Sequence, residues 1–197
     1  TERAIHNRVV LGITSEQPAG GVIIQRNAWS RVSGVLQTVN VAEGNLREMV
    51  INAALGLGEG VVSGIVSADQ IGVDKEGIRA GEPLRFRYIT RDKEEQVVFN
   101  KHTGLGTVLS HTLYHQRLRP ALEYIELYEL VRIADQLEAA YGYPLDIEFG
   151  IEGTKLWILQ ARPVVTFLAA LQETVQTHPL TVQKDPPSAS KAKEMPS

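Results

Sequence analysis

Four polar residues in the last third of the chain carry the functional groups that phosphate chemistry requires. They are two carboxylates, Asp146 and Glu148, the amide of Gln160 and the guanidinium of Arg162. Carboxylate and amide oxygens are ligands that magnesium prefers, and an arginine offers paired, planar donors to a phosphate. Because phosphoryl transfer depends mainly on positioning and on neutralisation of charge, this set contains the parts that the reaction needs.

The spacing of these residues predicts that a hairpin brings them together. Side chains alternate between the two faces of a strand, so Asp146 and Glu148 share one face, and Gln160 and Arg162 share a face of the next strand. Residues 152–154 provide a turn with a glycine for positive φ. If the strands pair, the four groups converge on one patch. The alternative is an edge hairpin with a surface ion pair between one of the acids and Arg162.

Short β-branched runs elsewhere predict further strands, and one helical repeat predicts a long helix. The strand segments are 22–25, 35–39, 49–53, 61–73 with its turns, 83–90 paired as a hairpin with 97–101, 145–149 and 156–160. Apolar residues at helical spacing follow Arg119, where Pro120 can open a helix that Gly142 closes. The expected fold is α+β, with mainly antiparallel strands and a few helices. Phe149 and Trp157 are interpreted as core residues.

Composition limits the class of protein. The chain has 197 residues, 43% of them hydrophobic, which favours one folded domain over residues 1–168, with residues 169–197 as a linker or disordered tail. A net charge of -3 gives no reason to expect nucleic acid or a membrane surface as a partner. The absence of cysteine excludes a disulfide scaffold and is consistent with a cytoplasmic protein. No apolar run approaches the roughly 18 residues of a membrane span.

Three segments, in the same order, resemble the ATP-grasp domain of the phosphoenolpyruvate synthase and pyruvate phosphate dikinase family, which includes rifampicin phosphotransferases. Residues 142–164 read GYPLDIEFGIEGTKLWILQARPV and are similar to the end of that domain. Residues 54–69 (ALGLGEGVVSGIVSAD) and residues 22–38 (VIIQRNAWSRVSGVLQT) are similar to two earlier motifs. The resemblance implies that residues 1–168 are the C-terminal part of an ATP-grasp nucleotide-binding domain.

The resemblance also implies roles for the four polar residues. Glu148 and Gln160 would hold magnesium on the phosphates of ATP. Arg162 would contact those phosphates and is the candidate catalytic residue, and Asp146 would support the metal or the nucleotide. The cofactors implied are therefore ATP and Mg²⁺.

Two more nucleotide-binding candidates follow from the same resemblance. Gln25 matches the hinge position beside which adenine lies, and Glu59 belongs to the glycine-rich segment. Asn27 replaces the usual methionine near the adenine pocket, and Gln37 replaces the usual phenylalanine. A dinucleotide-binding loop at residues 56–60 (GLGEG) is rejected, because a helix must follow such glycines and the valines that come next predict a strand.

The function that the resemblance implies is phosphotransfer. Mg-ATP would phosphorylate a histidine in a separate domain, and the phosphate would then pass to pyruvate or a similar acceptor. The expected partners are ATP and two parts of the same protein outside this chain, the phosphohistidine domain and the N-terminal half of the nucleotide-binding domain. As a fragment, the chain is expected to be inactive alone. The alternative is a degenerate, non-catalytic module that binds nucleotide or regulates.

Overall fold

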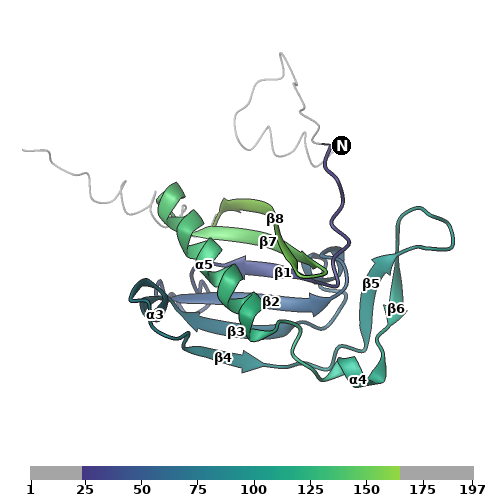
Figure 1. The fold of residues 1–197 in the computed structure, drawn as a ribbon, viewed down its shortest axis with the longest axis horizontal. Coiled ribbons are helices and arrows are strands. Elements are labelled where there is room, and N and C mark those ends of the chain that lie inside the picture. Colours follow the sequence, from purple (N-terminus) through teal and green to yellow (C-terminus); the bar gives the residue numbers. More distant parts are fainter. Residues whose placement is uncertain (1–23, 165–197) are drawn as a thin grey trace, which may run out of the picture.

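Six antiparallel strands build the main sheet of the computed structural model, which describes residues 24–164 (Figure 1). In spatial order they are β4 (Phe86–Ile89), β3 (Asp69–Asp74), β2 (Glu48–Leu55), β1 (Val32–Gln37), β7 (Leu145–Glu152) and β8 (Lys155–Pro163). A separate ribbon at one end of the sheet consists of β5 (Glu95–Phe99) and β6 (Thr107–His111). The helices of this region are α2 (Glu59–Val62), α3 (Lys75–Arg79), α4 (Tyr114–Arg117) and α5 (Tyr124–Tyr141). The predicted α+β class, with mainly antiparallel strands and a few helices, is confirmed.

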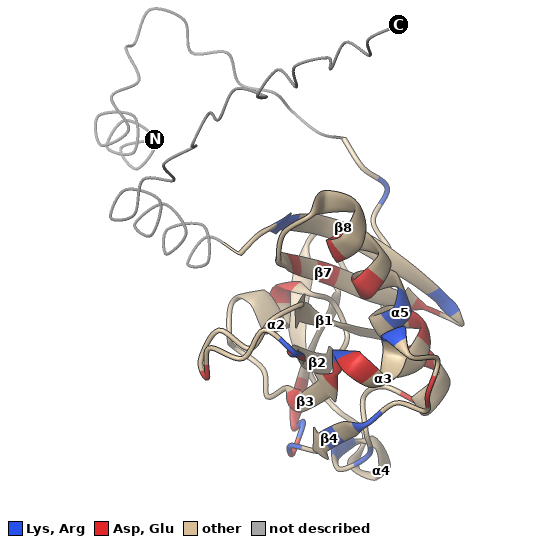
Figure 2. Ribbon diagram, turned by 90° about the vertical axis from the view of Figure 1, so that its left-hand side faces the viewer, with Lys and Arg blue, Asp and Glu red and all other residues tan. Residues whose placement is uncertain are grey.

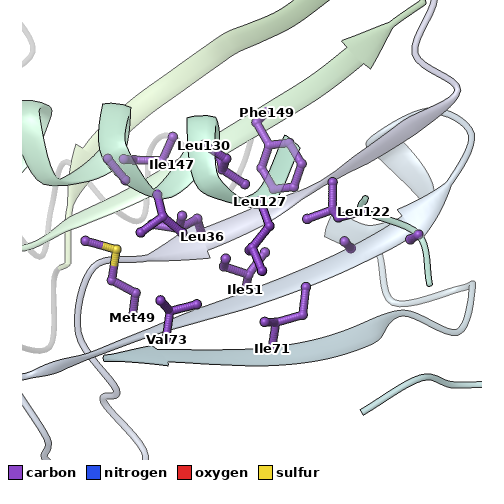
Figure 3. Packing of buried hydrophobic residues seen from close by; sticks show 14 of the residues in the cluster. Leu36, Met49, Ile51, Ile71, Val73, Leu122, Leu127, Leu130, Ile147 and Phe149 are labelled. Carbon is purple, nitrogen blue, oxygen red and sulfur yellow. The ribbon is translucent and has the colours of Figure 1, made fainter. Parts of the chain in front are cut away.

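One face of the main sheet forms the core with α5. Alternate strand residues point toward the helix, and their apolar side chains meet Leu127 and Leu130 of α5 (Figure 3). The labelled strand residues of this cluster are Leu36, Met49, Ile51, Ile71, Val73, Ile147 and Phe149. Phe149 is a core residue as predicted. Its ring leaves no room for a side chain at Gly34 of β1. A Cβ at Gly34 would lie 2.8 Å from that ring.

The opposite face of the sheet carries polar residues, because the same alternation sends the other half of each strand outward. Figure 2 shows α2 on this side of the sheet and α5 on the other. Cross-strand partners form two rows across the sheet. The first row is Arg162, Asp146, Gln37, Val50, Gly72 and Arg87. The second row is Gln160, Glu148, Val35, Asn52, Gln70 and Ile89. We call this surface the polar face.

Asp69 and Lys93 form an ion pair that is completely buried. Lys93 Nζ donates to Asp69 Oδ1 over 2.7 Å, and both side chains are 0% exposed. The same oxygen accepts the backbone N–H of Arg91 over 2.8 Å. Asp69 Oδ2 accepts the hydroxyl of Tyr88 over 3.0 Å and the N–H of Ala121 over 2.7 Å. One carboxylate therefore joins β3, β4, the segment before β5 and the segment before α5, and all of its bonds offset the cost of burying it.

The helix α5 begins later than the sequence predicts. Residues 119–120 were expected to open it, but the N–H of Leu122 donates to the hydroxyl of Tyr88 over 3.1 Å and is withdrawn from helical bonding. Glu123 and Glu126 then form a capping box at the true start. The predicted end is confirmed: Gly142 is the C-cap, with a φ of 76°.

Two strand predictions are wrong. Residues 83–90 and 97–101 do not pair with each other; β4 pairs with β3, and β5 pairs with β6. The reason is the buried Lys93, which draws the intervening segment inward instead of letting it form a tight turn. Residues 61–66 are not a strand either, because the helical turn α2 occupies their start and Gly64, with a φ of 70°, interrupts the run.

Two other expectations concern the ends of the chain. Residues 24–25 of the first predicted strand lie outside any strand, and residues 22–23 lie outside the described part. The tail predicted over residues 169–197 is also outside the described part. Within residues 24–164, no helix is both long and apolar enough to cross a membrane.

Replacing Asp69 with Asn keeps its shape but removes the charge that balances Lys93. We expect the free energy of unfolding, measured by urea denaturation, to fall by about 3–5 kcal/mol, because a buried ammonium loses its counter-ion. The control is Arg79→Gln, which breaks the exposed pair of Arg79 with Asp135 and should cost at most about 1 kcal/mol. A loss for Asp69→Asn no greater than that of the control would contradict the role of the pair.

Candidate functional site

The hairpin of β7 and β8 places the four candidate residues on one patch of the polar face. In the register of the two strands, Asp146 lies opposite Arg162 and Glu148 lies opposite Gln160. Directly opposed residues of an antiparallel pair point to the same side of the sheet, and their Cβ atoms lie about 4.5–5.5 Å apart. The turn is where the sequence predicts it, with Gly153 at a φ of 62°. The pairing and the convergence predicted from spacing are both present.

Arg162 and Asp146 are joined by a forked contact. The Nε and Nη2 atoms of Arg162 donate to Asp146 Oδ2 over 2.9 and 2.7 Å. This hydrogen bond, together with the charges of Asp146 and Glu148, raises the pKa of the Arg162 guanidinium above its ordinary value, so the group keeps its positive charge. The Arg162 side chain is 56% exposed and that of Asp146 only 12%. The ion pair that the alternative interpretation predicted is thus present, within the larger cluster.

The oxygen atoms beside this pair fit a hard cation such as Mg²⁺. Among the described residues, the side chains of Glu148 and Gln160 form no hydrogen bond, and Asp146 Oδ1 is buried without a partner. No group of three or more acidic or histidine residues within residues 24–164 is arranged to hold a metal. Magnesium does not need such a group, because it retains water and takes one or two carboxylates together with substrate phosphates.

A β-bulge changes which face of β8 each residue occupies. The register shifts between Glu148, which pairs with Gln160, and Phe149, which pairs with Ile158. The extra residue resets the alternation, so Trp157 pairs with Gly150. Trp157 therefore lies on the polar face beside Gln160, on the side opposite to α5. The prediction that Trp157 is a core residue is wrong, because alternation counted from the sequence contains no bulge.

A cavity of about 120 Å³ lies next to this tryptophan on the polar face. Its lining residues are Gln25, Arg26, Asn27, Ala28, Trp157 and Leu159. Gln25, the candidate for the adenine side, is exposed and belongs to an irregular segment over residues 24–30. The structure thus brings Gln25 beside Leu159 of β8, the residue before Gln160, but Gln160 itself does not line the cavity.

Two features hold the irregular segment against the hairpin. Glu152 accepts bonds from Arg26 Nη2 over 2.9 and 3.2 Å and from the N–H of Trp29 over 3.4 Å. Gly150 allows the segment to approach, because a Cβ there would lie 2.2 Å from Ser30 Oγ. Sequence reasoning missed both residues. The glycine after DIEF was a visible signal of a close approach.

Glu59 lies on the same side of the sheet but is not part of the cluster. It is the first residue of α2, and its Oε2 accepts the hydroxyl of Thr107 over 2.6 Å. The glycine-rich loop before it is tied to β1 by Ser33, whose Oγ donates to the carbonyl of Gly56 over 2.8 Å. A helix does follow these glycines, contrary to the prediction, but it has only four residues. A single turn does not provide the helix that a dinucleotide-binding loop opens.

Comparison with known proteins gives consistent matches. Residues 1–185 match the family described as pyruvate phosphate dikinase, AMP/ATP-binding domain. The chain is 34% identical over 173 residues to a probable phosphoenolpyruvate synthase of Methanocaldococcus jannaschii, covering 88% of this chain and 14% of that protein. It is 33% identical over 176 residues to the phosphoenolpyruvate synthase of Pyrococcus furiosus, with coverages of 84% and 20%. It is 32% identical over 166 residues to the rifampicin phosphotransferase of Bacillus subtilis, with coverages of 84% and 18%. The chain spans a fifth or less of these relatives.

The close approach at Gly150 can be tested by a substitution and its repair. We expect Gly150→Ala to lower the free energy of unfolding by about 1–3 kcal/mol, because the new methyl group displaces Ser30 and its segment. Ser30→Gly in the same chain should recover most of that loss, since it removes the Oγ and Cβ atoms that the methyl group meets. Urea denaturation of both single variants and the double variant gives the coupling. Simple additivity of the two losses would show that the segment does not pack there.

Proposed function

This chain belongs to the pyruvate phosphate dikinase AMP/ATP-binding domain family, and from that premise we propose that it is the ATP-binding part of a phosphotransferase. In this proposal Mg-ATP phosphorylates a histidine in a separate domain of the same protein. The phosphate then passes to pyruvate or a similar acceptor, in keeping with relatives named as phosphoenolpyruvate synthases and a rifampicin phosphotransferase. Because the chain spans so little of those proteins, the remaining steps belong to other parts of the polypeptide.

One observation carries the proposal: the pairing of Glu148 with Gln160 directly beside the forked contact of Arg162 with Asp146. Glu148 and Gln160 would hold Mg²⁺ with one carboxylate oxygen and one amide oxygen, as the free side chains and the preference of the ion for oxygen suggest. When bound, the ion would neutralise charge on the phosphates.

Arg162 would bind and orient the phosphates, since its guanidinium is charged and more than half exposed. A phosphate oxygen could share the guanidinium with Asp146, because an arginine has five N–H donors and Asp146 uses two of its nitrogens. Asp146 would keep Arg162 oriented toward the patch. Gln25 would lie beside the adenine base of the nucleotide. Glu59 would contribute to nucleotide binding indirectly, through the glycine-rich loop.

A second candidate function is a non-catalytic module that binds nucleotide or regulates. The observation that favours it is the completed ion pair itself, because Arg162 is already satisfied by Asp146 without a phosphate. The replacements at Asn27 and Gln37 also favour it. The two functions differ in whether removal of a metal ligand abolishes phosphorylation of histidine, so one set of variants separates them.

Glu148→Gln and Gln160→Ala should each abolish ATP-dependent phosphorylation of histidine in the full-length protein. The first keeps shape but removes the charge that offsets the metal, and the second removes a ligand. Labelled ATP and quantification of phosphohistidine measure the loss, and thermal melting should stay near that of the wild type.

Glu129→Gln is the matched control, because Glu129 is an exposed glutamate of α5, on the other side of the sheet. Its activity should equal that of the wild type. If Glu148→Gln and Gln160→Ala both retain activity within about threefold, which is roughly 0.6 kcal/mol of barrier, the metal site lies elsewhere. Binding of Mg-ATP without any phosphohistidine in the wild type would instead support the non-catalytic module.

A further inference from the structure

One oxygen of the Asp146 carboxylate has no hydrogen-bond donor. Oδ2 accepts both bonds from Arg162, over 2.9 and 2.7 Å, whereas Oδ1 is buried and has no partner among the described residues. A buried carboxylate is stable only while donors or an opposite charge compensate it. Within residues 24–164, Arg162 is the only side chain that donates to this carboxylate. A ligand that draws the guanidinium away therefore leaves Asp146 short of donors.

Gln37 is the neighbour of Asp146 on the side away from Arg162. In the strand registers, Asp146 of β7 lies opposite Arg162 on β8 and opposite Gln37 on β1. Directly opposed residues have Cβ atoms about 4.5–5.5 Å apart on the same face, a separation that a glutamine side chain can span to reach a carboxylate oxygen. The two oxygens of a carboxylate diverge, so Oδ1 turns toward β1 when Oδ2 is held at β8. Beyond Gln37 the row continues with Val50, whose side chain has no donor.

The amide of Gln37 is available for that bond. Its side chain is partly buried and forms no hydrogen bond within residues 24–164. It lines a cavity of about 250 Å³ over β1, β2 and β3, together with the amides of Asn52 and Gln70. This open volume lets the side chain change rotamer without moving a core residue. The phenylalanine that is usual at this position in the family has no donor, so the amide is a feature of this chain.

We propose that Gln37 is a positioning residue that compensates Asp146 when Arg162 turns to a phosphate. In that state a side-chain N–H of Gln37 donates to Asp146 Oδ1 and replaces part of what the guanidinium provided. The proposal rests on the proposed function and adds to its site a second, uncharged donor for Asp146. Gln37 acts through Asp146 and Arg162 and does not itself contact the nucleotide.

The test uses the full-length protein and the rate of phosphohistidine formation over a range of Mg-ATP concentrations. Gln37→Met keeps the length of the side chain and removes the amide. We expect the half-saturating concentration of Mg-ATP to rise about three- to tenfold, the size of one net hydrogen bond. The maximal rate should stay within about twofold of the wild type, because the bond is made in the bound state and in the transition state alike. Gln37→Glu should raise the half-saturating concentration further, since it adds a negative charge beside Asp146.

Gln70→Met is the matched control, because Gln70 is an exposed glutamine that lines the same cavity and lies opposite Asn52, away from Asp146. It should keep the half-saturating concentration of the wild type, and the melting temperatures of all variants without nucleotide should agree. The proposal is overturned if Gln37→Met leaves that concentration unchanged, if Gln70→Met raises it equally, or if Gln37→Met lowers only the maximal rate. In each of these cases the wild type still phosphorylates histidine, so the proposed function stands without the role of Gln37. A wild type that binds no Mg-ATP overturns both.

Discussion

The buried ion pair of Asp69 and Lys93 is the interaction on which the arrangement of the rest depends. A carboxylate without exposure must have every oxygen bonded, and here the partners come from segments that are far apart in the chain. Those partners fix where β4 ends, how the chain enters the ribbon of β5 and β6, and where α5 starts. Because α5 covers the sheet and leads through Gly142 into β7, the position of the candidate hairpin follows from the same pair.

The antiparallel registers of the strands gather the polar and charged side chains on one face of this framework. β1 lies between β2 and β7, so one alternation of side chains runs across the whole sheet and separates the apolar face from the polar face. The bulge at Leu159 is the one shift in the register of β7 and β8, and it places an aromatic residue on the face that also carries the amides and charges of the patch. A single inserted residue thus decides which face of β8 Trp157 occupies.

Local sequence signals predicted the parts of the fold that depend on neighbours in the chain. The final hairpin, the end of α5 at Gly142 and the convergence of Asp146 with Arg162 all follow from alternation and turn chemistry. The failures depend on distant partners. No residue near Lys93 in the sequence indicates that it will be buried against Asp69. The predicted pairing of β4 and the predicted start of α5 were therefore wrong. A bulge leaves no compositional mark, so Trp157 was assigned to the core.

The charges of the patch explain why metal and nucleotide would bind together. Two carboxylates, Asp146 and Glu148, accompany one guanidinium, Arg162, so the patch carries a net negative charge and repels a bare polyphosphate. In the proposed site, a divalent cation reverses that sign and turns repulsion into attraction. The contact of Arg162 with Asp146 then has a second consequence, because it keeps a mostly buried carboxylate compensated while the site is empty of phosphate. The ion pair that looks like a simple surface contact is therefore compatible with the proposed site, where it would hold the arginine in position until a phosphate shared it.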